Sequence, residues 1–91
     1  MTVKVELFTS DACRRCSETT DMLQDVIRSL GTGHFDLHII DVVVEIDTAV
    51  AAGVLFTPAL RINGGNANAA LQNKQALRKV LSVSLHGLAD P

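Results

Sequence analysis

Residues 3–16 read VKVELFTSDACRRC, an alternation of apolar and polar side chains that leads directly into a pair of cysteines. The odd positions from Val3 to Leu7 are apolar and the even positions between them are charged, a period of two that is typical of a strand. We therefore expect an edge-proximal or half-buried strand over residues 2–9. The alternation ends shortly before the cysteines, so a different element begins there.

A helix is expected to start at or near Cys13. Ser10 and Asp11 carry short polar side chains that can accept hydrogen bonds from the free N–H groups at the start of a helix. Farther along, apolar or small side chains recur at three- and four-residue steps, which indicates an amphipathic helix. These positions are Cys16, Thr19, Leu23, Val26, Ile27 and Leu30. The glycines at 31 and 33 are predicted to end it.

Cys13 and Cys16 are separated by two arginines and lie where the strand gives way to the helix. A cysteine at this place meets unpaired backbone N–H groups and the positive end of the helix dipole, which favour thiolate over thiol. Arg14 and Arg15 add positive charge, so we expect the pKa of the Cys13 thiol to lie below its free value of about 8.5. The pattern predicts Cys13 as nucleophile of a thiol–disulfide exchange and a more buried Cys16 as resolving thiol.

Three other interpretations of the cysteine pair stay open. A structural disulfide is disfavoured because no secretory signal is visible and reducing compartments keep such bonds open. A zinc site normally takes four ligands, whereas the chain has no second cysteine pair and its histidines are scattered; no catalytic role is assigned to these histidines. They are His34, His38 and His86. Finally, the cysteines could be reduced, buried and without function, since free cysteine packs as a small hydrophobe.

The next stretch predicts a second strand and a second helix. Phe35, Leu37 and Ile39, followed by residues 40–44, form a nearly continuous apolar stretch rich in β-branched side chains, which favours a central strand covered on both faces. A strand, a helix and a strand in this order require a right-handed crossover, so the first two strands should run parallel. Residues 45–52 have helical composition and are followed by Gly53, which predicts a short helix.

The last third of the chain predicts two strands and a helix. Pro58 precedes a strand-like run over residues 59–62, which ends at the turn-forming pair Asn63-Gly64. A weak partner strand is expected around residues 66–70. A C-terminal helix follows, with Asn73 as its cap and an apolar face at three- and four-residue steps. That face consists of Leu77, Val80, Leu81, Ser84, Leu85 and Leu88.

The composition predicts one compact domain over residues 1–91. Hydrophobic residues make up 47% and charged residues 20% of the chain, which suffices to bury a core beneath a charged surface. A net charge of −2, with no basic run longer than Arg14-Arg15, argues against a nucleic-acid partner. The apolar runs are far shorter than the roughly 20 residues of a membrane-spanning helix. We expect a cytoplasmic monomer without a membrane partner.

These features resemble the thioredoxin-like superfamily, in particular its small glutaredoxin-like and thioredoxin-like proteins of bacteria and archaea. The resemblance covers nearly the whole chain and rests on the first strand, on the cysteine pair, on IDV at 40–42 and on GVLFTPA at 53–59. It implies a three-layer α/β thioredoxin-like fold with the order β-α-β-α-β-β-α around a central mixed sheet. It also implies a disulfide oxidoreductase or electron carrier that cycles a Cys13–Cys16 disulfide and dithiol without a bound organic cofactor.

The resemblance further implies a substrate-binding role for Thr57 and Pro58. In the superfamily the proline at this position follows a cis peptide bond and lies against the cysteine pair. Such a proline cannot donate a backbone hydrogen bond, and it leaves the N–H and C=O of Thr57 beside the sulfur. Those groups can pair with an extended substrate chain by strand addition.

Some residues depart from the superfamily's usual pattern. Arg14 and Arg15 replace the Gly-Pro or Pro-Tyr usual between the cysteines, and Ala12 stands where thioredoxins have tryptophan. Leu7 occupies the position at which thioredoxins carry a buried acid. Glutaredoxins are apolar at this position, so Leu7 resembles the glutaredoxin-like proteins. Glutaredoxins hold glutathione partly through a Gly-Gly followed by an acid, whereas Gly64-Gly65 lies in the predicted turn. The docking surface should therefore differ from both.

The partners implied are a protein or small-molecule disulfide or thiol, together with a reductase or glutathione. An alternative function of another class is a redox-inactive thioredoxin-like scaffold that holds a metal or a [2Fe–2S] cluster between two protomers through the cysteines. Such clusters take four thiolates, whereas one chain has two cysteines.

Overall fold

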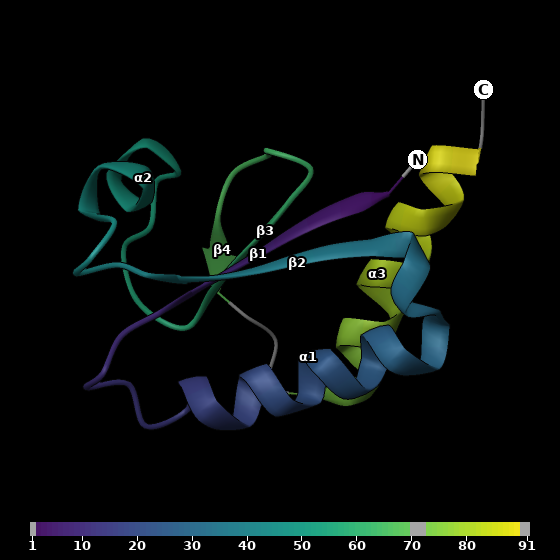
Figure 1. The fold of residues 1–91 in the computed structure, drawn as a ribbon, viewed down its shortest axis with the longest axis horizontal. Coiled ribbons are helices and arrows are strands. Elements are labelled where there is room, and N and C mark those ends of the chain that lie inside the picture. Colours follow the sequence, from purple (N-terminus) through teal and green to yellow (C-terminus); the bar gives the residue numbers. More distant parts are fainter. Residues whose placement is uncertain (1, 70–72, 90–91) are drawn as a thin grey trace.

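A computed structural model describes residues 2–69 and 73–89 of the chain (Figure 1). In these residues four strands, three α-helices and one 3₁₀ turn follow one another in the predicted order of strands and helices. They are β1 (Val3–Thr9), α1 (Cys16–Leu30), η1 (Thr32–His34), β2 (Phe35–Asp41), α2 (Ile46–Ala51), β3 (Ala59–Ile62), β4 (Asn68–Ala69) and α3 (Lys74–Ala89). The end of the strand expected around 66–70 lies outside the described residues.

The four strands form one mixed sheet in the order β2-β1-β3-β4. β1 runs parallel to β2 and antiparallel to β3, and β3 is antiparallel to β4. The parallel register pairs Val3 with Phe35 and Thr9 with Asp41. The predicted parallel βαβ unit in the first half is therefore confirmed.

The predicted place of the second strand was wrong, and the first strand, which lies next to the edge strand, is more buried than predicted. β1 is a central strand with neighbours on both sides, and β2 lies at the edge of the sheet, where Ile39 is 45% exposed. The strand also ends at Asp41, because residues 42–45 turn away from the sheet. The charged residue Glu6 made the sequence of β1 resemble a half-exposed strand. In the structure Glu6 is buried and forms an ion pair with Arg61.

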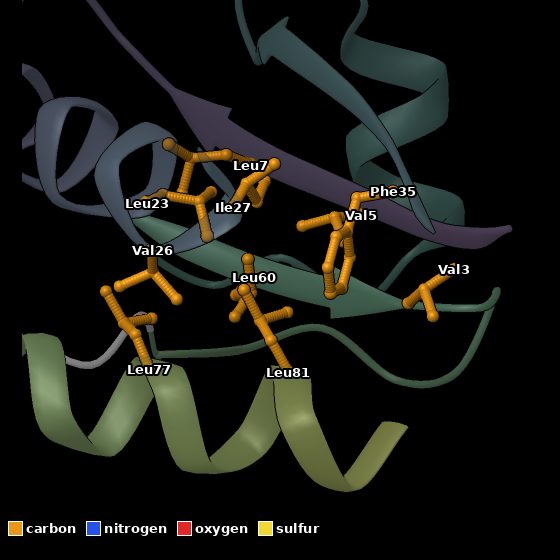
Figure 2. Packing of buried hydrophobic residues seen from close by; sticks show 10 residues of the cluster. All are labelled: Val3, Val5, Leu7, Leu23, Val26, Ile27, Phe35, Leu60, Leu77 and Leu81. Carbon is orange, nitrogen blue, oxygen red and sulfur yellow. The ribbon is translucent and has the colours of Figure 1, made fainter. Parts of the chain in front are cut away.

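The main core lies between one face of the sheet and the two long helices (Figure 2). Side chains from three strands meet side chains from α1 and α3, and burial of each stabilises the fold by about 1.5–3 kcal/mol before entropic costs. The cluster consists of Val3, Val5, Leu7, Leu23, Val26, Ile27, Phe35, Leu60, Leu77 and Leu81. This cluster is aliphatic apart from Phe35.

A smaller cluster lies on the other face of the sheet, beneath α2. It joins Phe8 of β1 and Ile40 of β2 to two alanines of the α2 region, and it includes Ala59 of β3. Figure 1 shows α1 and α2 on opposite sides of the sheet. The predicted three-layer α/β architecture with a mixed central sheet is confirmed.

Most predicted local signals have the expected structure. Gly31 ends α1 at a φ of 113°, and a Cβ there would lie 2.8 Å from the His34 ring. The Asn63-Gly64 turn has positive φ at both residues, 52° and 74°, as tight hairpins require. Asn73 caps α3, since its side-chain oxygen accepts hydrogen bonds from the backbone N–H groups of the next turn.

The start of α1 was predicted wrongly. The helix begins at Cys16 and not at Cys13, and its N-cap, Arg15, makes no side-chain capping bond. The side chain of Ser10, expected to cap the helix, forms a hydrogen bond with Thr57 instead. This leaves residues 10–15 as a loop between β1 and α1.

Candidate active site

The cysteine pair lies at the end of this loop and forms a disulfide between Cys13 and Cys16, whose Cα atoms are 5.4 Å apart. Cys13 lies in the loop, where its backbone N–H donates a 3.1 Å hydrogen bond to the carbonyl oxygen of Ser10. Cys16 is the first residue of α1. One sulfur is thus carried by a hydrogen-bonded loop and the other by a helix.

The two cysteines differ in exposure in the direction predicted. Cys16 is only 5% exposed because it lies on the buried face of α1, seven residues before Leu23, the first side chain of that helix in the main core. Cys13 is half-buried and borders an open hollow at the surface. A substrate can therefore approach Cys13 from solvent, while the protein covers Cys16.

The hollow brings together most of the site residues predicted from the sequence. Cys13, Thr57 and Pro58 line it, although the cysteine and the proline are far apart in the chain. The Thr57–Pro58 peptide bond is cis, and β3 begins at the next residue. The full lining consists of Ser10, Ala12, Cys13, Arg14, Arg15, Phe56, Thr57 and Pro58.

Two polar features shape this hollow. The hydroxyl groups of Ser10 and Thr57 are 3.2 Å apart and share a hydrogen bond. Arg14 and Arg15 are exposed on its rim, and within residues 2–69 and 73–89 neither forms an ion pair. The two guanidinium groups thus remain available to an anionic group of a bound partner.

Leu7, the position of the buried acid in thioredoxins, is fully buried in the main core. The neighbouring acid, Glu6, lies on the opposite face of β1, where both of its oxygens accept hydrogen bonds from Arg61 at 2.7 and 2.8 Å. These hydrogen bonds lower the pKa of the Glu6 carboxyl, although burial opposes the shift. Glu6 therefore supports the sheet and does not face the cysteines.

The sequence did not identify Ser10 and Phe56 as parts of the site. Ser10 was interpreted as a helix cap, and Phe56 was noted only within the 53–59 segment. Both line the hollow. Phe56 is adjacent to Thr57, and this adjacency was the one signal in the sequence that could have indicated its place.

Within the described part of the chain, no group of three or more His, Cys, Asp or Glu side chains lies close enough to hold a metal ion. His38 forms a 3.0 Å pair with Asp36 on the exposed edge strand. No helix within that part is long and apolar enough to cross a membrane.

Known proteins are similar to this chain in sequence or in fold. Residues 1–82 match the family described as Thioredoxin domain. A probable thioredoxin of Methanothermobacter marburgensis is 33% identical over 64 residues, which cover 70% of this chain and 74% of that protein. A probable thioredoxin of Methanothermobacter thermautotrophicus is 31% identical over 64 residues, with the same shares covered.

The structure of the first two thioredoxin domains of Naumovozyma dairenensis Eps1p has the same fold, with a TM-score of 0.67 and 14% identity. The match covers 88% of this chain and 34% of the Eps1p chain. A Cys-x-x-Cys pair at the start of a helix thus occurs here in a thioredoxin fold, which supports a general role in thiol–disulfide chemistry. The chain belongs to the thioredoxin domain family.

Proposed function

We propose that this protein is a thiol–disulfide oxidoreductase or electron carrier that cycles between the Cys13–Cys16 disulfide and the dithiol without a bound organic cofactor. The observation that carries the proposal is the unequal exposure of the two sulfur-bearing residues. Cys13 borders the open hollow, while Cys16 is 5% exposed. This arrangement suits a nucleophile that meets the substrate and a resolving thiol that meets only Cys13.

In the reductive direction, the Cys13 thiolate attacks one sulfur of a substrate disulfide. The substrate S–S bond breaks, a mixed disulfide to Cys13 forms, and the departing thiolate takes up a proton from solvent. Cys16 then loses its proton and attacks the Cys13 sulfur, which releases the second substrate thiol. Two electrons have moved to the substrate, and a reductase or glutathione returns two electrons to the protein.

Thr57 and Pro58 are assigned to substrate binding. No described residue forms a backbone hydrogen bond with Thr57, so its N–H and C=O are available beside Cys13. An extended substrate segment can pair with these groups as an added strand. Such pairing would hold the substrate sulfur near Cys13 through backbone hydrogen bonds, which do not depend on the substrate's side chains.

Reduction of a small disulfide or of insulin by dithiothreitol tests the proposal. The wild-type protein should accelerate the reaction, and Cys13→Ser should abolish the acceleration because no nucleophile remains. Ser17→Ala is a matched control, since Ser17 is exposed beside the pair and carries no assigned role. Equal turnover by the wild type and Cys13→Ser would disprove the assignment of the nucleophile.

The proposal includes a cytoplasmic monomer that exchanges electrons with protein or small-molecule disulfides. The glutaredoxin-like character suggested by Leu7 stays a prediction, and the named relatives are probable thioredoxins. The alternative of a cluster-binding scaffold needs ligands beyond the two cysteines. A coloured, dimeric protein after anaerobic cluster reconstitution would favour that alternative.

A further inference from the structure

The described part of the chain exposes an unusual amount of apolar surface in one region. Of its eight exposed large hydrophobic residues, six lie between positions 43 and 56. The most exposed is Leu55, at 89%, and the others are Val43, Val44, Ile46, Val50 and Phe56. Concentrated apolar surface of this kind marks a place where another molecule binds.

All of these side chains except Val44 border a groove between α2 and residues 54–57, which we call the apolar groove. Val43, Val50 and Leu55 line it, and its volume is about 390 Å³. The apolar groove and the active-site hollow adjoin each other, because Phe56 and Thr57 line both. Figure 1 shows α2 and the loop before α1 at the same end of the sheet, with residues 53–58 running between them.

The lining of the active-site hollow also includes positive charge. Arg14 and Arg15 line it and are exposed, whereas Arg28 and Arg61 are paired with carboxylates of this chain. The arginine pair is therefore complementary to a carboxylate supplied from outside. A molecule that reacts with Cys13 can therefore meet both the arginine pair and the adjoining apolar groove.

On the basis of the proposed function, we infer that the preferred substrate is a disulfide within an extended polypeptide segment of a particular composition. The segment carries large apolar side chains on one side of its reactive cysteine, which enter the apolar groove. It carries an acidic side chain on the other side, which pairs with Arg14 or Arg15. Glutathione has no large apolar side chain, so it would leave the groove empty.

Synthetic peptides with one cysteine in a mixed disulfide with 5-thio-2-nitrobenzoate serve as probes. The reduced protein passes two electrons to this disulfide and becomes the Cys13–Cys16 disulfide, and peptide thiol and coloured thionitrobenzoate are released. Two of these peptides carry Leu-Val on one side of the cysteine and Asp-Asp on the other: in one peptide Leu-Val precedes the cysteine, and in the other Leu-Val follows it. Comparison peptides replace Leu-Val by Ser-Gly or Asp-Asp by Lys-Lys. Hydroxyethyl disulfide provides the rate for a substrate without side chains.

The faster of the two peptides that carry both Leu-Val and Asp-Asp should react about tenfold faster than the peptide with Ser-Gly in place of Leu-Val. The reason is that its apolar side chains are transferred from water into the apolar groove. For each protein, the rate with this peptide is divided by the rate with hydroxyethyl disulfide. Leu55→Ser should lower this ratio about 3–10-fold. Val83→Ser is the matched control, because Val83 is 62% exposed on α3 and lies outside the groove. The ratio of the two rates should be the same for this variant as for the wild type. The double variant Arg14→Glu, Arg15→Glu should invert the preference between Asp-Asp and Lys-Lys peptides.

Failure of the inference differs from failure of the proposed function. A wild-type protein that reduces hydroxyethyl disulfide but reacts equally with all peptides would overturn the inference alone. A protein that reduces none of the probes would overturn the proposed function. Sedimentation that shows a dimer of the wild type but not of Leu55→Ser, together with equal peptide rates, would assign the groove to self-association and overturn the inference.

Discussion

Ser10 and Thr57, which are 47 positions apart in the chain, are joined by a hydrogen bond of 3.2 Å between their hydroxyl oxygens. The backbone carbonyl oxygen of Ser10 also accepts a hydrogen bond from the backbone N–H of Cys13. The loop that carries Cys13, the more exposed of the two cysteines, is thereby fixed to the segment that precedes Pro58. Both hydroxyl groups lie in partly buried surroundings, where a hydrogen bond is exchanged with water less readily than at the surface.

Removal of this bond should weaken the folded state. Ser10→Ala and Thr57→Val should each lower the free energy of unfolding of the oxidised protein by about 0.5–1.5 kcal/mol. The double variant should lose less than the sum of the two, because the second change finds no bond to break. Urea unfolding measures all three, with exposed Ser17→Ala as control. Strictly additive losses would mean that the two hydroxyl groups do not stabilise each other.

The two arginines should make the disulfide a better oxidant. Positive charge near Cys13 stabilises its thiolate, and thus the reduced protein, so the double change Arg14→Gln, Arg15→Gln should raise the pKa of the Cys13 thiol. The reduction potential should become more negative by about 10–40 mV, from about 0.3–1 kcal/mol per surface charge and about 30 mV per 1.4 kcal/mol. Both side chains are exposed, so salt should reduce the shift.

Thiol titration and redox equilibration with glutathione at low salt measure these two quantities. Arg78→Gln is the control, because it removes an exposed charge on α3 far from the cysteine loop in sequence and outside the hollow. No change, or a change of opposite sign, would mean that the arginines act only in partner docking.

The order of elements was predictable because its signals are local. Periods of two and of three to four residues fix strands and helices, and Asn63-Gly64 and Asn73 mark a turn and a cap whatever the rest of the chain does. Whether a strand is central or at the edge depends on which strands pair with it. Here β3 returns to pair with β1 from a distant part of the sequence, which no local pattern reports.

The site was predictable to a similar degree. The spacing of the cysteines and their place before a helix indicated their chemistry, and the resemblance to a known superfamily indicated Thr57 and Pro58. The helix start was missed because the Ser10 side chain bonds to Thr57, a tertiary contact, and does not cap the local helix. The apolar groove was missed because the second strand was expected to continue through residues 42–44, which turn outward.

The ion pair between Glu6 and Arg61 predicts a pH dependence of stability. The arginine lowers the pKa of the Glu6 carboxyl in the folded state below its ordinary value near 4.5. The unfolded state therefore binds its proton at a higher pH, and the stability due to this group is complete above that value. It should be lost as the pH falls through the lowered pKa of the folded state.

Glu6→Gln should accordingly flatten the acid limb of the stability curve. The free energy of unfolding, measured in urea at a series of pH values below 5, should fall less steeply for Glu6→Gln than for the wild type. Asp25→Asn is the comparison for an exposed carboxyl whose pKa is lowered by Lys74. An identical acid limb in Glu6→Gln and the wild type would mean that the ion pair contributes nothing to stability.

Trapping of the mixed disulfide tests the central claim most directly. Reduced Cys16→Ser should accumulate a covalent adduct with a disulfide substrate, because Cys13 attacks and no thiol resolves the product. Reduced Cys13→Ser should accumulate far less, since Cys16 is 5% exposed. Intact mass and peptide mapping identify the modified sulfur. Adducts found mainly on Cys13 are the predicted result, and adducts that form equally fast on Cys16 in Cys13→Ser would contradict the assignment of nucleophile and resolving thiol.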